Sequence, residues 1–363
     1  MASSNNILSF NCSHNAAVCY LKDGKLKWFL EEERTSRQKH DHRPYLTLTK
    51  AVEICDSLDW ALHTTIHHVD DIKLGERVSN LCAELISKVM FRNAAVEYHG
   101  ETKCNFKDCS DEHHIHHAAL GFYNSGFEEA ACLIVDGAGA WVEGGGHEVE
   151  TIYKASYPHT FDKVHQRAVP WYKGSTLTDY TIGIGFVYAG ISEYLGFGTL
   201  GCGKLMGLAP YGEDDPNIKS FLVDGEVDET LWERDPNGVK FKPYDYIDRD
   251  KSPDHEHTYR SQCNLAWRCQ KDFETYMIAL IKKASEVSNN IVLSGGCALN
   301  CVANYNYLKH LPEGAKLYVE PVSTDAGTAV GMAMYAWRKL TGSKEIYPIK
   351  DLYWGPQRNE ILF

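Results

Sequence analysis

Four histidines crowd into five positions of the segment 111–120, where two carboxylates precede them and small or apolar residues follow. On a helix, His113 and His117 are four residues apart and share one face about one turn apart, which suits two ligands of a single metal ion. Taken alone, a histidine pair with this spacing is more often a polar, solvated helix end. A metal site therefore depends on further ligands elsewhere in the chain.

Two glycine turns follow predicted strands and are suited to phosphate. The apolar run 130–136 ends in Asp136-Gly-Ala-Gly139, which puts a carboxylate and bare backbone at a sheet edge. A phosphate or its cation can come close there. The strand 290–294 leads into Ser294-Gly-Gly296 and a helix, whose N-terminus could lie against nucleotide phosphates or a ribose.

Lys204 and Asp325 are two further candidates for binding a ligand. Lys204 is the one cation in the glycine-rich stretch 196–212. Asp325 precedes the last predicted helix, where it is equally suited to be a helix cap or a ligand.

The predicted elements place these groups at strand ends. The turn Asp23-Gly24 predicts a hairpin between strands at 16–21 and 25–30, preceded by a strand at 7–11, so that the polar loop 11–15 lies at one end of a sheet. Periodicity predicts helices at 46–58, 78–91, 177–195 and 259–288, and a final helix that ends at about 340. Strands are predicted at 66–69, 144–156 and 316–320. The polar stretch 213–257 is predicted to be a peripheral insertion.

The recurring strand-to-glycine turns are arranged as in two-lobed ATPases of the actin, sugar-kinase and heat-shock type. The predicted fold is therefore α/β, with mixed sheets flanked by helices. We expect one domain at 1–345, with a first lobe at about 1–150 and a second at about 151–345.

Composition describes an ordinary globular protein, because 44% of the 363 residues are hydrophobic and 24% are charged. No apolar run reaches the roughly eighteen residues of a membrane-spanning helix, and the N-terminus lacks a signal-peptide pattern. We expect a cytoplasmic protein, with its twelve scattered cysteines reduced. The net charge of −12 argues against broad binding of nucleic-acid backbone.

Longer motifs, spread over almost the whole chain, resemble a known family. They lie at 13–17, 31–41, 113–122, 135–139, 203–212, 294–304 and 325–329, and the most distinctive are Lys-x-Met-Gly-Leu-Ala-Pro-Tyr-Gly and Gly-Gly-x-Ala-Leu-Asn-Cys-Val-Ala-Asn. The chain resembles the O-carbamoyltransferases of the nodulation and antibiotic-tailoring type. Their N-terminal domain is related to the ATPase that transfers threonylcarbamoyl to tRNA.

The resemblance implies roles for individual residues. His113, His117 and Asp325 match the metal ligands, for which Fe2+ is the usual assignment. His14 matches a histidine at the reacting centre, a candidate general base. Lys39 matches a lysine that contacts carbamoyl adenylate, with Arg37 in support. The positions that match nucleotide-binding residues are Asp136, Gly137, Gly139, Lys204, Gly295, Gly296 and Asn300.

The implied reaction has two stages, in which ATP and carbamoyl phosphate give carbamoyl adenylate and the carbamoyl group then passes to a hydroxyl. The expected acceptor is a small molecule or sugar, with a hydroxymethylated nucleobase as a less favoured case. A second copy of the chain is a further expected partner, as a homodimer.

Three departures from the family pattern bear on this interpretation. Ala140 stands where many relatives have Glu, and His116 stands where a small residue is commoner and is expected to be exposed. Relatives also carry a YrdC-like domain that makes the adenylate. Residues 346–363 resemble only the start of that domain, so we expect activation to come from the rest of a longer chain or from another chain.

Two other functions fit part of the pattern. Two histidines and one carboxylate also form the iron site of non-haem oxygenases, but that class leaves the glycine turns and Lys204 unexplained. A non-catalytic, nucleotide-binding partner of an activating subunit is the second alternative. The presence of His14, Lys39 and the three metal ligands argues against it.

Overall fold

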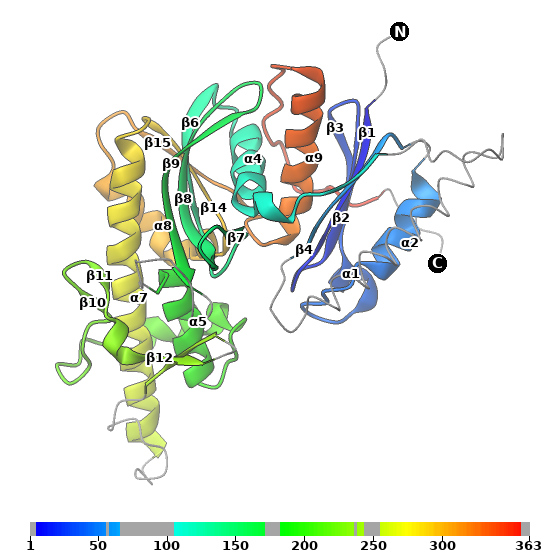
Figure 1. Cartoon of the computed structure of the whole chain (residues 1–363). Coiled ribbons are helices and arrows are strands. Elements are labelled where there is room, and N and C mark those ends of the chain that lie inside the picture. The colour runs from blue at the N-terminus through cyan, green and yellow to red at the C-terminus, as the bar shows by residue number, and fades with distance from the viewer. Residues whose placement is uncertain are drawn as a thin grey trace, which may run out of the picture.

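The computed structural model describes residues 5–55, 58–65, 105–170, 182–235, 238–242 and 255–356. Within these residues the chain forms two principal β-sheets with helices between them and on their outer faces (Figure 1). The predicted helix at 78–91 and strand at 66–69 lie outside the described residues.

The first sheet has the strand order β3-β2-β1-β4-β5. Strands β1, β2 and β3 form the predicted antiparallel hairpins, whereas β4 and β5 are parallel to β1. Alternate residues of β1 and β2 point into two apolar clusters on opposite faces of the sheet, so both faces are covered. The bounds are β1 Asn6–Cys12, β2 Ala17–Lys22, β3 Lys25–Glu31, β4 Trp60–Thr65 and β5 Asn105–Asp108.

The second sheet has the order β15-β14-β6-β8-β7, and β9 also pairs with β8. Strand β14 runs parallel to both β6 and β15. The carboxyl ends of β6 and β14 therefore meet at one sheet edge, and the two predicted glycine turns follow them. The bounds are β6 Glu129–Val135, β7 Trp141–Val142, β8 Gly146–Ser156, β9 Thr160–Pro170, β14 Asn290–Ser294 and β15 Lys316–Val319.

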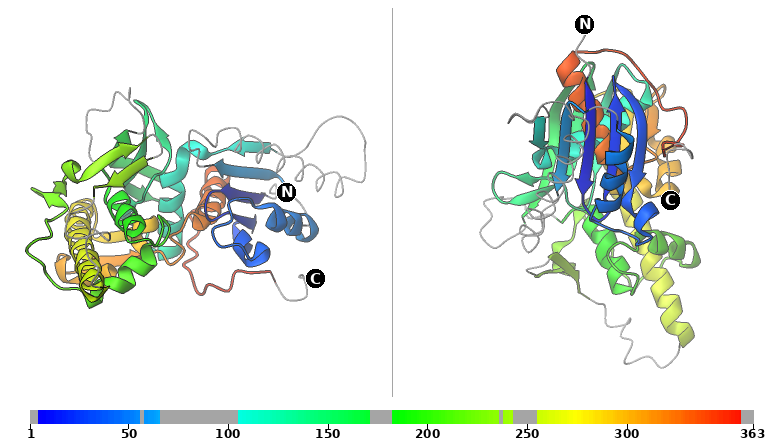
Figure 2. Two further views of the ribbon diagram at one scale, coloured as in Figure 1. Left: turned by 90° about the horizontal axis from the view of Figure 1, so that it is seen from below. Right: turned by 90° about the vertical axis from the view of Figure 1, so that its right-hand side faces the viewer.

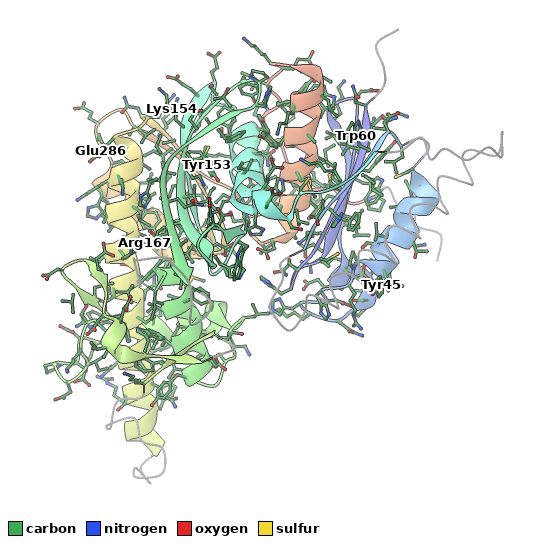
Figure 3. All side chains as sticks on the ribbon, in the orientation of Figure 1. Tyr45, Trp60, Tyr153, Lys154, Arg167 and Glu286 are labelled. Carbon is green, nitrogen blue, oxygen red and sulfur yellow. The ribbon has the colours of Figure 1, made fainter. Side chains whose placement is uncertain are left out.

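Two helices lie between the sheets. Helix α4, His113–Ser125, packs on β6 and β14, and α9, Ala326–Thr341, packs on β1 and β2. The two helices also pack against each other, and their side chains fill the space between the sheets (Figures 1 and 3). This pairing brings residues about two hundred positions apart in the sequence to one place.

The outer faces carry the remaining helices. Helices α1, Glu32–Ser36, and α2, Tyr45–Ile54, lie against the first sheet. The far side of the second sheet carries α5 Ile184–Tyr194, α6 Cys202–Leu208, α7 His255–Ser285 and α8 Cys301–Tyr307. In the left view of Figure 2 the long α7 and the first sheet lie at opposite ends of the molecule.

Several predicted bounds differ from the structure. The glycine-rich stretch 196–212 contains a short helix, α6, and a 3-10 turn at Ala209–Tyr211. The insertion at 213–257 holds two small hairpins, β10 Leu222–Val223 with β11 Glu226–Val227, and β12 Trp232–Asp235 with β13 Gly238–Phe241. The second sheet begins at β6, so residue 150, the predicted change of lobe, lies inside β8.

Candidate metal centre

The first two turns of α4 carry His113 and His117, whose side chains are 2% and 0% exposed. Their ring centroids are 4.8 Å apart, as expected for two residues one helical turn apart on one face. The helix persists through a run of histidines because its following turns are apolar and fully buried between the sheets. The tertiary environment therefore removes this pair from water.

Two carboxylates from distant segments complete the cluster. Asp136 follows β6, and its Oδ2 lies 3.4 Å from Nε2 of His113 and 3.5 Å from Nε2 of His117. Asp325 precedes α9, and its Oδ1 lies 3.7 Å from each of the same two nitrogens. One ligand atom from each of the four residues lies within 4.8 Å of the others.

These spacings fit a divalent cation. Ligand bonds of 2.0–2.2 Å in a tetrahedral arrangement place neighbouring ligand atoms about 3.4 Å apart. Nδ1 of both histidines and Oδ2 of Asp325 have no hydrogen-bond partner in the described part of the chain. Two imidazoles with two carboxylates are a suitable donor set for Fe2+, Mn2+ or Zn2+. The residues present therefore fit a metal ion.

Opposite charges in the cluster stabilise one another. Burial alone would lower the pKa of His117, but Asp136 and Asp325 outweigh it and raise the pKa to about 9. Burial would likewise raise the pKa of Asp325, but His14, His117 and His113 hold it at about 2. Burial would also raise the pKa of Asp136, but His113 and His117 hold it well below its ordinary value. Both carboxylates are therefore ionised at neutral pH, and a metal cation would take the place of the proton on His117.

Asp325 does not act as a side-chain cap of α9, which was one of the two alternatives for it. No cap hydrogen bond is made by its carboxylate, although it occupies the N-cap position. Its backbone carbonyl instead accepts from the hydroxyl of Thr328 and from the side chain of Asn11. The carboxylate is left free to face the histidines, as the ligand alternative requires.

His14 lies at the edge of the cluster on the loop between β1 and β2. Its side chain is 44% exposed, and Nδ1 is 3.5 Å from Oδ2 of Asp325. The loop is held by Asn11, whose side-chain amide donates to Ser13 Oγ, Asn15 O and Asp325 O, while its Oδ1 accepts from the backbone N–H of Ala17. Asn11 is therefore a positioning residue that the sequence did not single out.

The polar segment after α1 approaches His14. The rings of His40 and His14 have centroids 6.2 Å apart. Partial burial, followed by the positive charges of Lys39 and His14, lowers the pKa of His40. Lys39 and Arg37 are both exposed, and within the described residues neither side chain forms an ion pair with the metal cluster.

The two glycine turns meet at Asp136. Its Oδ1 accepts from the backbone N–H groups of Gly137, at 2.7 Å, and Gly296, at 3.3 Å. Gly295 has φ of 91°, and a Cβ there would lie 2.5 Å from Val135 O, so the turn requires glycine. At Gly137 a Cβ would meet nothing within 4 Å, which shows open space beside the carboxylate.

The other predicted nucleotide residues have different surroundings. Gly139 packs tightly, since a Cβ there would lie 2.7 Å from the ring of His114. The Asn300 side chain caps α8 at Ala303 and exchanges two hydrogen bonds with Gln270, so it is used within the second lobe. Lys204 is exposed on α6, with no ion pair to the cluster among the described residues.

The expected exposure of His116 is wrong, because its side chain is 0% exposed beneath α9. His114 is also fully buried, and its Nδ1 lies 2.7 Å from Thr151 Oγ1. Neither belongs to the four-residue cluster. The sequence assigned Asp136 to nucleotide binding and not to the metal ligands. Its position at a strand end, next to glycines that allow close approach, was nevertheless a signal for a cation site.

Comparisons with known proteins agree with this arrangement. Residues 70–334 match the protein family described as "Carbamoyltransferase N-terminus". The nodulation protein NolNO of Sinorhizobium fredii is 25% identical over 373 residues, covering 94% of this chain and 49% of that protein. An uncharacterized Synechocystis protein, sll1178, is 26% identical over 399 residues, covering 95% of this chain and 59% of its own length.

The chain thus spans about half to three fifths of the length of these relatives. Among solved structures, T. kodakarensis HypF aligns with a TM-score of 0.50 and 13% identity over 93% of this chain and 48% of that one. This likeness confirms the predicted α/β fold with mixed sheets flanked by helices. In the described part of the chain, no helix has the length and apolar character needed to cross a membrane.

Proposed function

Because the chain belongs to the carbamoyltransferase N-terminal family, we propose that it passes a carbamoyl group to the hydroxyl of an acceptor at the centre formed by His113, His117, Asp136 and Asp325. The observation that carries the proposal is the position of His14. A solvent-exposed imidazole stands 3.5 Å from a carboxylate of an otherwise buried metal centre. An acceptor can reach this group, while the centre itself is closed to bulk water.

The proposed donor is carbamoyl adenylate, formed from ATP and carbamoyl phosphate. The open space at Gly137, beside the carboxylate of Asp136, is suited to a phosphate next to the metal centre. When bound, a divalent ion such as Fe2+ would supply positive charge to the donor oxygens. Asp136 would then lie between the nucleotide turns and the metal, which unites the two roles predicted for this part of the chain.

His14 is the proposed general base. Asp325 beside Nδ1 favours a proton on that nitrogen, which leaves Nε2 to accept the proton of the acceptor hydroxyl. The acceptor oxygen then forms a bond to the carbamoyl carbon, the bond from that carbon to the adenylate oxygen breaks, and AMP leaves. Lys39, exposed on the segment whose His40 approaches His14, would neutralise the leaving phosphate.

The test is transfer from synthetic carbamoyl adenylate to candidate alcohols and sugars, with mass spectrometry detecting the gain of one carbamoyl group. His14→Ala should keep the metal and lose transfer by about 100-fold or more, because a general base contributes roughly that much. His117→Ala should lose metal and transfer together. Exposed His310→Ala is the matched control and should change neither.

Stoichiometric metal in His117→Ala would contradict the ligand assignment. Full transfer by His14→Ala would contradict the role of the base. If the wild-type chain bound nucleotide and metal but transferred nothing to any acceptor, the second candidate would stand: a nucleotide-binding partner of an activating subunit.

The oxygenase alternative is weakened by the structure. Its three-ligand site requires open positions for oxygen and a co-substrate, whereas four protein groups converge here.

Four expectations stay predictions: the acceptor, the YrdC-like activating domain or chain, the homodimer and the cytoplasmic location. Supplying carbamoyl phosphate and ATP in place of the adenylate, with and without an added activating domain, tests where activation occurs.

A further inference from the structure

A second group of metal-ligand side chains lies on another side of α4. Cys109 follows β5, Glu112 ends the 3-10 turn Ser110–Glu112, and His116 lies in the first turns of α4. One ligand atom from each lies within 4.8 Å of the others. The spacing Cys-x2-Glu-x3-His places all three on one short stretch of chain, and none of the three belongs to the cluster around Asp325.

His116 is buried although its ring nitrogens lack hydrogen-bond partners among the described residues. Its side chain is 0% exposed, yet neither Nδ1 nor Nε2 has a hydrogen-bond partner in the described part of the chain. A buried polar group without a partner costs roughly 1–3 kcal/mol, so an imidazole with two such nitrogens is unusual. Nε2 lies 3.9 Å from Glu112 Oε2, and Cys109 is 3% exposed beside them.

We propose that Cys109, Glu112 and His116 bind a Zn2+ ion, with water as the fourth ligand. Thiolate, imidazole and carboxylate are the three ligand types that Zn2+ takes in proteins. Tetrahedral bonds of 2.0–2.3 Å require ligand atoms about 3.3–3.6 Å apart, so the 3.9 Å between His116 and Glu112 needs only a small contraction. Binding replaces the proton of the Cys109 thiol, which is released to solvent.

The surroundings allow an ion and water to enter. Glu112 is 20% exposed and lines a cavity of about 730 Å3 bounded also by Trp141, Glu148 and Gln166. Lys107 and Lys339 lie 3.6 and 3.8 Å from the Glu112 carboxylate, but each is about half exposed and free to turn away. The thiolate and the carboxylate offset the two charges of the ion.

Such an ion would fix the start of α4 to the end of β5. Cys109 already accepts a backbone hydrogen bond from Glu112 and donates one to His63 on β4. The first turn of α4 carries His113, so the second ion would stiffen the segment that presents a ligand of the first. The proposal concerns metal binding alone and does not depend on carbamoyl transfer.

The experiment titrates the metal-free full-length chain with Zn2+ and with Co2+, whose bond to thiolate gives a charge-transfer absorption in the near ultraviolet. We expect two equivalents of metal and this absorption in the wild type. His117→Ala should bind one equivalent and keep the absorption. Cys109→Ser should bind one equivalent and lose it.

Two further variants guard against misfolding and against non-specific thiol binding. Glu112→Gln changes a partly exposed side chain and should fold, with affinity for the second ion lowered by at least tenfold. Cys132→Ala removes a buried cysteine from the apolar cluster on the second sheet and should keep both ions. A wild type that lacks the thiolate absorption, an absorption retained by Cys109→Ser, or unchanged affinity in Glu112→Gln would overturn the proposal, whereas one equivalent with the absorption would remove only the first metal centre.

Discussion

The close approach of α4 and α9 gives the sharpest test of how the metal centre is assembled. Gly331 on α9 faces the backbone of α4, where an added Cβ would lie 1.9 Å from the carbonyl oxygen of His116 and 3.1 Å from Cβ of Leu120. Ordinary carbon-to-oxygen contacts are about 3.3 Å or longer. The substitution Gly331→Ala therefore requires the two helices to separate by about 1.4 Å.

Two opposing terms set the effect on stability. Overpacking costs about 1–3 kcal/mol, and the upper end applies because the obstructing atom is backbone and cannot rotate away. Replacing glycine by alanine within a helix stabilises it by about 1 kcal/mol. The net expectation is a loss of about 2 kcal/mol in the free energy of unfolding, measured by denaturant titration.

The same displacement should weaken the metal centre. His113 and His117 belong to α4, and Asp325 immediately precedes α9, so separating the helices would lengthen the 3.7 Å nitrogen-to-oxygen distances to about 5 Å. One carboxylate would then be out of reach of a shared ion. We expect metal affinity, measured by calorimetric titration, to fall by at least tenfold.

Gly207→Ala is the matched control, because Gly207 lies on α6 and a Cβ there would meet nothing within 4 Å. It should leave metal affinity unchanged and alter stability by no more than about 1 kcal/mol. If Gly331→Ala behaved like this control in both assays, α4 and α9 would not be in backbone contact. The account of the metal centre as a product of their packing would then be refuted.

Three further outcomes are expected. Removing metal with a chelator should lower the unfolding midpoint. Restoring free metal to about 100 times its Kd should raise the free energy of unfolding by about 2.7 kcal/mol, and a midpoint that did not depend on metal would disprove this. Asn11→Ala should destabilise the chain by about 1–3 kcal/mol, since it leaves the N–H of Ala17 without its acceptor, and should reduce transfer more than metal content. Glu32→Ala should lower the free energy of unfolding, measured with denaturant, by about 1–2 kcal/mol, because the buried carboxylate accepts from the N–H groups of Leu46 and Thr47 at the start of α2. Glu32→Gln should lower it by less.

Much of the local structure could be read from the sequence. The hairpin around Asp23-Gly24 and the strands before the turns at Asp136 and Gly295 follow from turn chemistry and apolar runs, and all are present. The one-turn spacing of His113 and His117 likewise follows from helix geometry. These features depend on neighbours within a few residues, which is why sequence patterns report them.

Other assignments depended on which segments pack together. The exposure of His116 could not be read from its helix, because α9, more than two hundred residues later, covers it. Asn300 matched a nucleotide-binding pattern, yet a buried partner, Gln270 on α7, engages its side chain. Burial and hydrogen-bond partners from distant segments are set by tertiary packing and leave no periodic signal in the sequence.

The metal centre shows the division most clearly. The sequence by itself determined that two histidines share a helical face and that carboxylates stand at Asp136 and Asp325. Only the packing of α4 against β6 and α9 decided that both carboxylates approach the same nitrogens, at 3.4–3.7 Å. Four ligands converge because two sheets bury these helices face to face, and that contact is a property of the folded chain.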